Sequence, residues 1–275
     1  MKIAIQGIAA SFHDIAARQY FGKDIQTVEC DTFAACFDAV TQQRADAALV
    51  AIENSLFGSI NQVYDLLLHH DVTISGEIYL RIEQCLIGLP GAQVNNIREV
   101  HSHPVALAQC EDYLDMHLSL AERLEHHDTA ASVASIKQWN DPTKAAIASA
   151  QAATLHGMSV LAEGIETNTE NYTRFVAVHR KDTKQQDDSA NKTSLILVTD
   201  HKPGALYHAL GVFADHGINL LKLQSRPIIG QAWHYMFYID IDIAAQDSAF
   251  ATIYQQLEQQ NCEVIHLGSY LTTIT

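Results

Sequence analysis

The sequence predicts an α/β protein with two lobes that face each other across a cleft, followed by a smaller βαββαβ domain. Three observations lead to this prediction. Short apolar runs alternate with amphipathic segments through most of the first 162 residues, which indicates parallel sheets covered by helices on both faces. Two long extended segments, residues 77–88 and 172–178, interrupt the alternation and are expected to join the lobes. A polar stretch, residues 179–192, then separates a second series of elements.

The first lobe is expected over about residues 1–78 with 172–180, and the second over about 79–171. The first-lobe strands are expected at 3–6, 25–29 and 47–52, and its helices at 11–20, 32–42 and 60–68. The second-lobe strands are expected at 99–101, 120–124, 145–148 and 159–162, and its helices at 104–115, 129–138 and 150–155. In such folds a ligand binds between the carboxyl ends of the strands, so the cleft is the expected site.

The whole catalytic part is expected at residues 1–180, a linker at 181–191 and the last domain at 192–275. In the last domain, strands are expected at 193–199, 218–225, 233–242 and 263–267, and helices at 204–216 and 247–260. Core-facing positions are expected at Leu206, Leu210 and Phe213 of the first helix and at Trp233, Tyr235, Phe237, Ile239 and Ile241 of the third strand. The βαββαβ order is the ferredoxin-like arrangement, whose sheet edges commonly pair with another subunit, so we expect an oligomer.

Composition narrows the function. The 275 residues carry 17 Lys and Arg against 32 Asp and Glu, a formal net charge of −15, which disfavours binding to nucleic acid or to an anionic membrane. The five cysteines are odd in number and form no C-x-x-C pair, which indicates free thiols in a reducing compartment. Met1 leads directly into the first strand, and no apolar stretch is long enough to span a membrane. We therefore expect a cytoplasmic protein.

Polar segments at strand ends are the candidate ligand contacts. Ser11 opens a helix after the first strand, and it could hold a carboxylate or simply cap the helix. Glu53, Asn54 and Ser55 directly follow a buried strand, where ligand contacts are favoured over a plain surface turn. Ser102 lies at the positive end of a helix that begins with Pro104, and a capping role is equally open. The spacing does not decide whether Gln109 reaches the same cleft.

The stretch 168–175, Asn-Thr-Glu-Asn-Tyr-Thr-Arg-Phe, places hydroxyl and ionisable side chains at the mouth of another strand. The paired histidines His69-His70 and His126-His127 have no metal-binding spacing around them, so no metal is expected. No glycine-rich phosphate-binding pattern follows the first strand, so no nucleotide cofactor is expected either.

Taken together, these motifs resemble the prephenate dehydratase family. The resemblance extends over nearly the whole chain and rests on segments in the family's order: 53–55 with 58–59, 102–104 with 106–110, 129–131, 145–148 and 171–175. Segments 192–195, 203–206 and 225–227 resemble the regulatory ACT domain. Two positions depart from the family pattern, with Val105 where Gln is usual and Gln224 where Glu is usual. Some members carry a chorismate mutase segment, which is not expected here because the chain begins at the dehydratase strand.

The resemblance implies a two-lobed, periplasmic-binding-protein-like domain that removes water and carbon dioxide from prephenate to give phenylpyruvate, without a cofactor or metal. It implies Thr173 next to the departing hydroxyl, with Glu53 as an acid if it is desolvated. The other implied catalytic residues are Asn54, Ser102 and Gln109, and the implied substrate-binding residues are Ser11, Ser55, Thr129, Arg174 and Phe175.

The same resemblance implies feedback control by L-phenylalanine, bound between two ACT domains of a homodimer or homotetramer. The implied contacts are Gly204, Ala205, Leu206, Asn219, Ser225, Arg226 and Pro227. Three other functions stay open from the sequence. A structural or scaffolding role has the least support, because the sequence shows no exposed apolar repeat, and two functions compete more closely. One is an arogenate dehydratase, which performs the same chemistry on an amino analogue of the substrate, and the other is a non-catalytic, amino-acid-sensing two-lobed binding protein.

Overall fold

The computed structural model describes residues 1–183 and 188–272. Residues 184–187 of the expected linker therefore lie outside the described residues. The chain forms two compact units: the first is Met1–Leu66 with Ile78–Phe175, and the second is Leu67–Glu77 with Val176–Thr275. Two long strands, β5 (Val72–Arg81) and β11 (Tyr172–Arg180), each run from one unit into the other.

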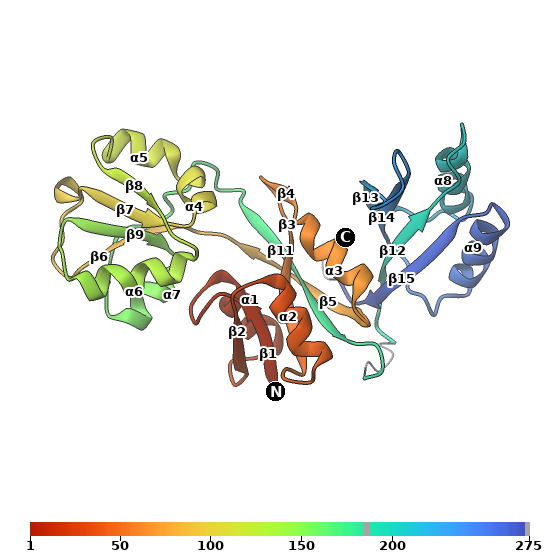
Figure 1. Ribbon diagram of the computed structural model, residues 1–275, viewed down its shortest axis with the longest axis horizontal. Helices are drawn as coiled ribbons and strands as arrows, with labels where there is room; N and C mark the ends of the chain where they lie inside the picture. The colour runs from red at the N-terminus through yellow and green to blue at the C-terminus, as the bar shows by residue number, and fades with distance from the viewer. Residues whose placement is uncertain (184–187, 273–275) are drawn as a thin grey trace. The chain divides into compact units, whose positions relative to one another are not determined.

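The first sheet has the strand order β2-β1-β3-β11-β5, and the short β4 pairs with β3 (Figure 1). Its other strands are β1 (Lys2–Gln6), β2 (Gln26–Cys30), β3 (Ala47–Asn54) and β4 (Gly58–Ser59). The helices that connect these strands are α1 (Phe12–Phe21), α2 (Phe33–Thr41) and α3 (Asn61–His69). Pairing of β1 with β2 and with β3 is parallel, as the alternating pattern predicts. The first six residues of β3 are all buried, as expected for a strand covered on both faces.

The second sheet, order β10-β6-β9-β7-β8, is covered by helices on both faces. Its strands are β6 (Cys85–Gly88), β7 (Glu99–Ser102), β8 (Glu122–Glu125), β9 (Lys144–Ala148) and β10 (Ser159–Ala162). Leu86 and Ile147 pack with α4 (Pro104–Gln109) and α5 (Glu111–His117) on one face. Ile87 and Ala146 pack with α6 (Thr129–Trp139) and α7 (Ala150–His156) on the other. In Figure 1, α4 and α5 lie on the opposite side of this sheet from α6 and α7. A short 3-10 helix, η1 (Val94–Asn96), precedes β7.

Two expectations about this region are wrong in detail. The single helix expected over 104–115 is two helices, because the backbone leaves the helical conformation at Cys110, which caps α4 and precedes α5. The single extended segment expected over 77–88 is two strands in different sheets, β5 and β6. Between them, the N–H groups of Ile82 and Gln84 bond to Asn171 and Glu166, which takes the chain out of the first sheet.

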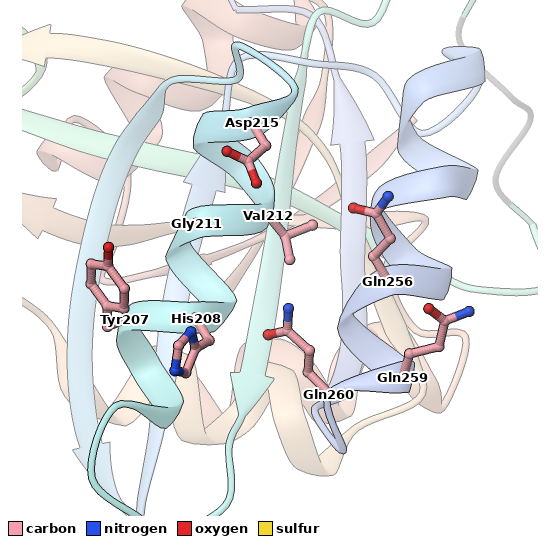
Figure 2. A pocket seen from close by; sticks show the side chains of 8 residues that line it. All are labelled: Tyr207, His208, Gly211, Val212, Asp215, Gln256, Gln259 and Gln260. Atoms are coloured by element: carbon pink, nitrogen blue, oxygen red, sulfur yellow. The ribbon is translucent and has the colours of Figure 1, made fainter.

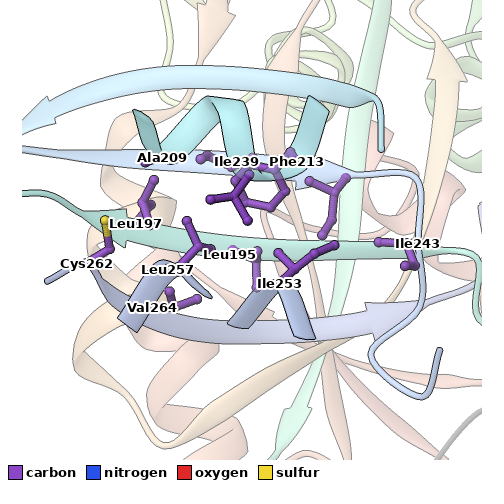
Figure 3. Packing of buried hydrophobic residues seen from close by; sticks show 12 residues of the cluster. Leu195, Leu197, Ala209, Phe213, Ile239, Ile243, Ile253, Leu257, Cys262 and Val264 are labelled. Atoms are coloured by element: carbon purple, nitrogen blue, oxygen red, sulfur yellow. The ribbon is translucent and has the colours of Figure 1, made fainter. Parts of the chain in front are cut away.

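The third sheet has the order β13-β14-β12-β15, and the βαββαβ prediction is confirmed. Its elements are β12 (Lys192–Val198), α8 (Ala205–Asp215), β13 (Leu220–Pro227), β14 (Tyr235–Ile241), α9 (Ser248–Gln259) and β15 (Glu263–Tyr270). Figure 3 shows α8 and α9 packed on the sheet around Phe213, Ile239 and Leu257. Together the two-lobed α/β part and this domain match the predicted fold class.

Three core positions expected in this domain are corrected. The buried residues of α8 are Ala209, Val212 and Phe213, so the stripe is rotated away from Leu206 and Leu210, which are only partly buried. Trp233 was expected in the strand, but it lies before β14, has a positive φ of 65° and is 78% exposed. The turn that precedes the strand therefore removes Trp233 from the alternating pattern.

The five cysteines are free and buried, as expected. Within the described ranges, no helix has both the length and the apolar character that crossing a membrane requires.

Candidate functional site

The densest cluster of predicted site residues lies where β3 ends beside the start of β11. Asn54, the last residue of β3, donates from Nδ2 to Thr173 Oγ1 at 2.9 Å and to Asn171 Oδ1 at 2.8 Å. A third, longer contact of 3.2 Å joins the same nitrogen to the Tyr172 carbonyl. Thr173 and Asn171 are two residues apart on one extended segment, so their side chains leave the same face.

The amide of Asn54 has one defined orientation. Its Oδ1 accepts the backbone N–H groups of Leu56 at 3.0 Å and Phe57 at 3.1 Å, which belong to the turn after β3. The nitrogen must therefore be the atom that faces Thr173. Since Thr173 Oγ1 accepts this bond, its own hydroxyl proton points elsewhere, and it meets no acceptor among the residues the structure describes. The hydroxyl proton of Thr173 is thus available to donate a hydrogen bond.

Two further contacts hold the strands together here. Ser55 Oγ donates to the Glu170 carbonyl at 2.8 Å and accepts the Tyr172 N–H at 2.9 Å. The hydroxyl of Ser55 is therefore occupied by hydrogen bonds to the backbone at the start of β11. Glu53 Oε2 lies 3.9 Å from Arg174 Nη1, and Arg174 is 5% exposed. This contact places a guanidinium beside a partly exposed carboxylate.

Phe175 is 1% exposed and its ring meets His13 edge-on at 5.0 Å, so the side chain of Phe175 belongs to the core and not to an open site. His13, on α1, accepts the Ala51 N–H at its Nε2, 3.2 Å away. Burial lowers the pKa of His13 from 6.5 to about 4, so its imidazole is neutral near pH 7. Sequence reasoning missed His13, whose only signal is a polar residue within an otherwise apolar helix face.

A second amide pair joins the other lobe to the connecting segments. Gln84, 2% exposed, donates from Nε2 to Oε1 of Gln109 at 3.0 Å. Gln84 Oε1 is buried and has no hydrogen-bond partner within residues 1–183 and 188–272. The backbone N–H of Gln84 donates to Glu166, whose other oxygen lies 3.2 Å from Arg81. Sequence reasoning also missed Gln84, although a glutamine between two apolar strands is itself a signal.

Ser102 does not reach an open site. It is fully buried, and its Oγ donates to the Ile147 carbonyl of the neighbouring strand at 2.6 Å. Ser11 is also buried and caps α1 by accepting the Asp14 N–H, so the capping interpretation describes its contact. The structure therefore gives both serines structural contacts and does not bring Ser102 to the Thr173 cluster through any contact.

Thr129 begins α6, next to the residue that caps it. The cap, Asp128, lies against Gly7 at the end of β1: a Cβ at Gly7 would be 2.7 Å from Asp128 Oδ2 and 3.3 Å from Ser11 Oγ. Gly7 also has a positive φ of 94°, so two constraints keep a glycine at this position. Ser11 and Asp128, the residue before Thr129, come from different lobes and both lie against Gly7.

The expected regulatory residues fall on two faces of the third sheet. Gly204 caps α8 with a positive φ of 83°, and Ala205 and Leu206 form the first turn. Ser225 and Pro227 on β13 pair with Phe237 and Tyr235, and so share the face that carries α8 and α9. Arg226 and Gln224 point to the opposite face, because neighbouring strand residues alternate. Asn219 is exposed before β13, and its N–H donates to Asp242.

A pocket of about 540 Å³ lies between α8 and the end of α9 (Figure 2). Tyr207, His208 and Val212 line it from α8, and Gln256 and Gln260 line it from the other side. None of the expected regulatory residues lines this pocket. Over the ranges 1–183 and 188–272, no group of three or more His, Cys, Asp or Glu side chains could hold a metal ion.

Comparison with known proteins adds independent findings. A family model for prephenate dehydratase matches residues 3–183, and one for the ACT domain matches residues 193–259. Arogenate dehydratase 2 of Petunia hybrida is 34% identical over 98% of this chain and 71% of its own length. The prephenate dehydratase of Arthrobacter aurescens, solved with L-Phe, is 31% identical with a TM-score of 0.88 over 99% of this chain and 90% of that one. GqqA, described as a novel type of quorum quenching acylase, is also 31% identical, with a TM-score of 0.89 over 100% and 99%.

Proposed function

Because this chain belongs to the prephenate dehydratase family and carries an ACT domain, we propose that it converts prephenate to phenylpyruvate under control by L-phenylalanine. In this reaction the bond from the ring to its carboxylate breaks and its electron pair enters the ring. The bond from the opposite ring carbon to the hydroxyl breaks at the same time, and one proton completes the departing water. Carbon dioxide is the other product, and formation of the aromatic ring drives the reaction.

One observation carries the assignment of roles: Thr173 Oγ1 accepts from the Asn54 amide, which leaves the hydroxyl proton of Thr173 for the substrate. A departing hydroxyl needs a hydrogen bond or a proton at its oxygen as the bond breaks. Thr173 supplies the hydrogen bond, while a threonine is too weak an acid to lose its proton outright. Asn54 stabilises the developing negative charge on Thr173 through its own N–H.

The two carboxylates of the substrate need cationic or N–H partners. Arg174 is the cation of the cluster, and its partly exposed partner Glu53 yields to a substrate carboxylate if the pair, 3.9 Å apart, separates on binding. The starts of α1 and α6, marked by Ser11 and Thr129, offer helix N-termini from both lobes. Gln109 is assigned to substrate orientation, because the nitrogen of its amide has no partner among the described residues.

The regulatory assignment places L-phenylalanine at the start of α8, next to β13. Gly204 leaves room for the ligand, and Ser225 and Pro227 line the same face. As β13 is an edge strand, a second subunit at this edge would complete the site, and we propose a homodimer or homotetramer. Arg226 points the other way, so its expected role in the same ligand site requires the partner. A cytoplasmic location stays a prediction.

Two other activities are part of the test. Arogenate differs from prephenate by an amino group in place of the keto oxygen, and a relative at 34% identity is named an arogenate dehydratase. Acylase activity is suggested only by the likeness to GqqA. An acylase needs an activated nucleophile, whereas the Ser102 hydroxyl donates to a carbonyl and that of Thr173 accepts from an amide.

The test is turnover by the purified full-length protein with prephenate, arogenate and an N-acyl amine in parallel, each with and without millimolar L-phenylalanine. We expect prephenate turnover, seen as phenylpyruvate absorbance in alkali, and its suppression by L-phenylalanine. Faster turnover of arogenate would change the substrate, and hydrolysis of the acyl amine alone would replace the function. No turnover by protein that melts cooperatively would favour the non-catalytic binding protein.

A further inference from the structure

Asn171 is a buried polar residue at the start of the family segment 171–175, and none of the roles above is assigned to it. It is fully buried, and its Oδ1 accepts a hydrogen bond from Asn54 Nδ2 at 2.8 Å. Its own Nδ2 is also buried and has no hydrogen-bond partner in the part of the chain that the structure describes. An unpaired buried N–H is costly, so an apolar residue of similar size would suit the fold at least as well.

The orientation of Asn171 follows from that of its neighbour. The turn N–H groups of Leu56 and Phe57 fix the oxygen of Asn54, so the nitrogen of Asn54 faces Asn171. A flipped Asn171 would place two N–H donors against each other. Asn171 therefore presents its oxygen to Asn54 and leaves its own nitrogen unpaired, and the unpaired nitrogen is the cost of providing that acceptor.

The acceptor matters because Asn54 has two N–H bonds to direct. One is held by Asn171 Oδ1, which leaves the other aimed at Thr173 Oγ1, 2.9 Å away. Without Asn171 Oδ1, the first N–H would lack a strong partner, and the amide could turn toward the Tyr172 carbonyl, 3.2 Å away. Thr173 Oγ1 would then lose its donor, and its hydroxyl proton would be free to rotate.

We propose that Asn171 is a positioning residue of the dehydration step, which fixes the amide of Asn54 so that the Thr173 proton is directed at the departing hydroxyl. The inference rests on the proposed function. Asn171 touches no reacting atom and acts through Asn54 and Thr173. A purely structural role would lower stability and leave the rate per folded molecule unchanged, which separates the two roles by experiment.

The experiment measures kcat and KM for prephenate, and thermal melting, in full-length Asn171→Leu and Asn171→Asp variants. Leucine removes both the acceptor and the unpaired donor, so melting should change little while kcat falls about 10- to 100-fold and KM stays within about threefold. Aspartate keeps an oxygen for Asn54, and its kcat should recover to within about tenfold of the original protein. Asn191→Leu is the matched control, since Asn191 bonds Thr272 through both ends of its amide in the other unit.

An unchanged kcat in a folded Asn171→Leu variant would overturn the inference while leaving the function intact. Equal losses in the Leu and Asp variants would also overturn it, because the acceptor would then be irrelevant. If Asn171→Leu does not fold, Asn171→Ala replaces it, and if Asn171→Asp does not fold, the split between kcat and KM decides alone. A folded original protein that turns over no prephenate would remove the proposed function and this inference with it.

Discussion

Two buried amide pairs, Asn54–Asn171 and Gln84–Gln109, have similar hydrogen bonds of 2.8 and 3.0 Å but differ in what fixes them. In the first pair, Asn54–Asn171, backbone N–H groups of a turn hold the oxygen of Asn54. The hydrogen bond of this pair therefore has one direction, or polarity, with Asn54 as the donor and Asn171 as the acceptor. Among the described residues, no backbone group holds either amide of the second pair, and Gln84 Oε1 has no hydrogen-bond partner. Turning both glutamine amides together would exchange donor for acceptor at similar cost. The Asn54–Asn171 pair, whose donor and acceptor are fixed, can therefore direct the Thr173 proton. The Gln84–Gln109 pair, whose donor and acceptor can exchange, suits substrate orientation.

The largest effect on kcat is expected at Thr173, to which the Asn54 amide of the first pair donates. Thr173→Val keeps the shape of the side chain and removes the hydroxyl, so kcat should fall on the order of 10²- to 10³-fold with little change in KM. Thr173→Ser, which keeps the hydroxyl, is the control and should retain most of the rate. Steady-state kinetics with prephenate gives the result, and near-normal turnover of the Val variant would remove Thr173 from the mechanism.

Replacing the hydrogen-bond donor of the first pair by an acceptor should lower kcat nearly as much. Asn54→Asp replaces the donor by an acceptor, which repels Asn171 Oδ1 and draws the Thr173 proton toward itself. We expect kcat to fall about 10²-fold and the free energy of unfolding to fall by about 1–3 kcal/mol. Gln109→Glu is the matched change in the second pair, where the acceptor for Gln84 is kept. Equal losses in the two variants would show that the pairs do not differ as argued.

The sequence predicted much of this architecture because periodicity reports burial. It indicated the parallel pairing around the all-buried start of β3 and the βαββαβ order of the last domain. It could not separate a ligand contact from a structural one, since both use the same residue types. Ser102 at a helix start and Phe175 in a motif were expected at the site, yet one bonds a buried carbonyl and the other is core.

What the sequence missed depends on contacts between distant segments. Asn171 and Asn54 are 117 positions apart, and only folding places the two amides together. The break at Cys110 and the exit of Trp233 from its strand likewise depend on backbone geometry that composition does not encode. A polar residue that alternates with a candidate at i and i+2 is a usable signal, because both share one strand face. Applied here, it links Asn171 to Thr173.

A smaller effect is expected at the second pair. Gln84→Leu removes the donor to Gln109 together with the unpaired oxygen, so the free energy of unfolding should change by less than about 1 kcal/mol. Gln109 then loses its restraint, and KM should rise about two- to fivefold while kcat stays within about twofold. Measuring kcat and KM of Gln84→Leu and Asn171→Leu under the same conditions compares the two pairs directly. A kcat loss as large as that of Asn171→Leu would mean that the second pair also directs the chemistry.

The smallest effect is a pH dependence that should act on the first pair alone. His13 accepts the Ala51 N–H on β3 and packs against Phe175 on β11, so it braces the two strands that carry Asn54 and Thr173. The pKa of His13 is about 4 in the folded protein against 6.5 in the unfolded chain. The unfolded state therefore binds more protons between these values, and stability is lost as the pH falls from 6.5 toward 4.

His13→Gln isolates this contribution, because the amide oxygen can accept the Ala51 N–H at any pH. The original protein should lose about 2–3 kcal/mol through His13 between pH 6.5 and 4, which corresponds to roughly 4–12 °C of melting temperature. The loss of stability of the variant should be smaller by that amount. The pKa values of His101, His103 and His156 are also lowered, and these residues titrate in both proteins, so their contribution cancels in the comparison. If the melting temperatures of the two proteins fall by the same amount between pH 6.5 and 4, His13 does not brace the strands. A difference in melting with equal kcat values at pH 5 would show that the brace supports the strands without affecting the polarity of the Asn54 amide.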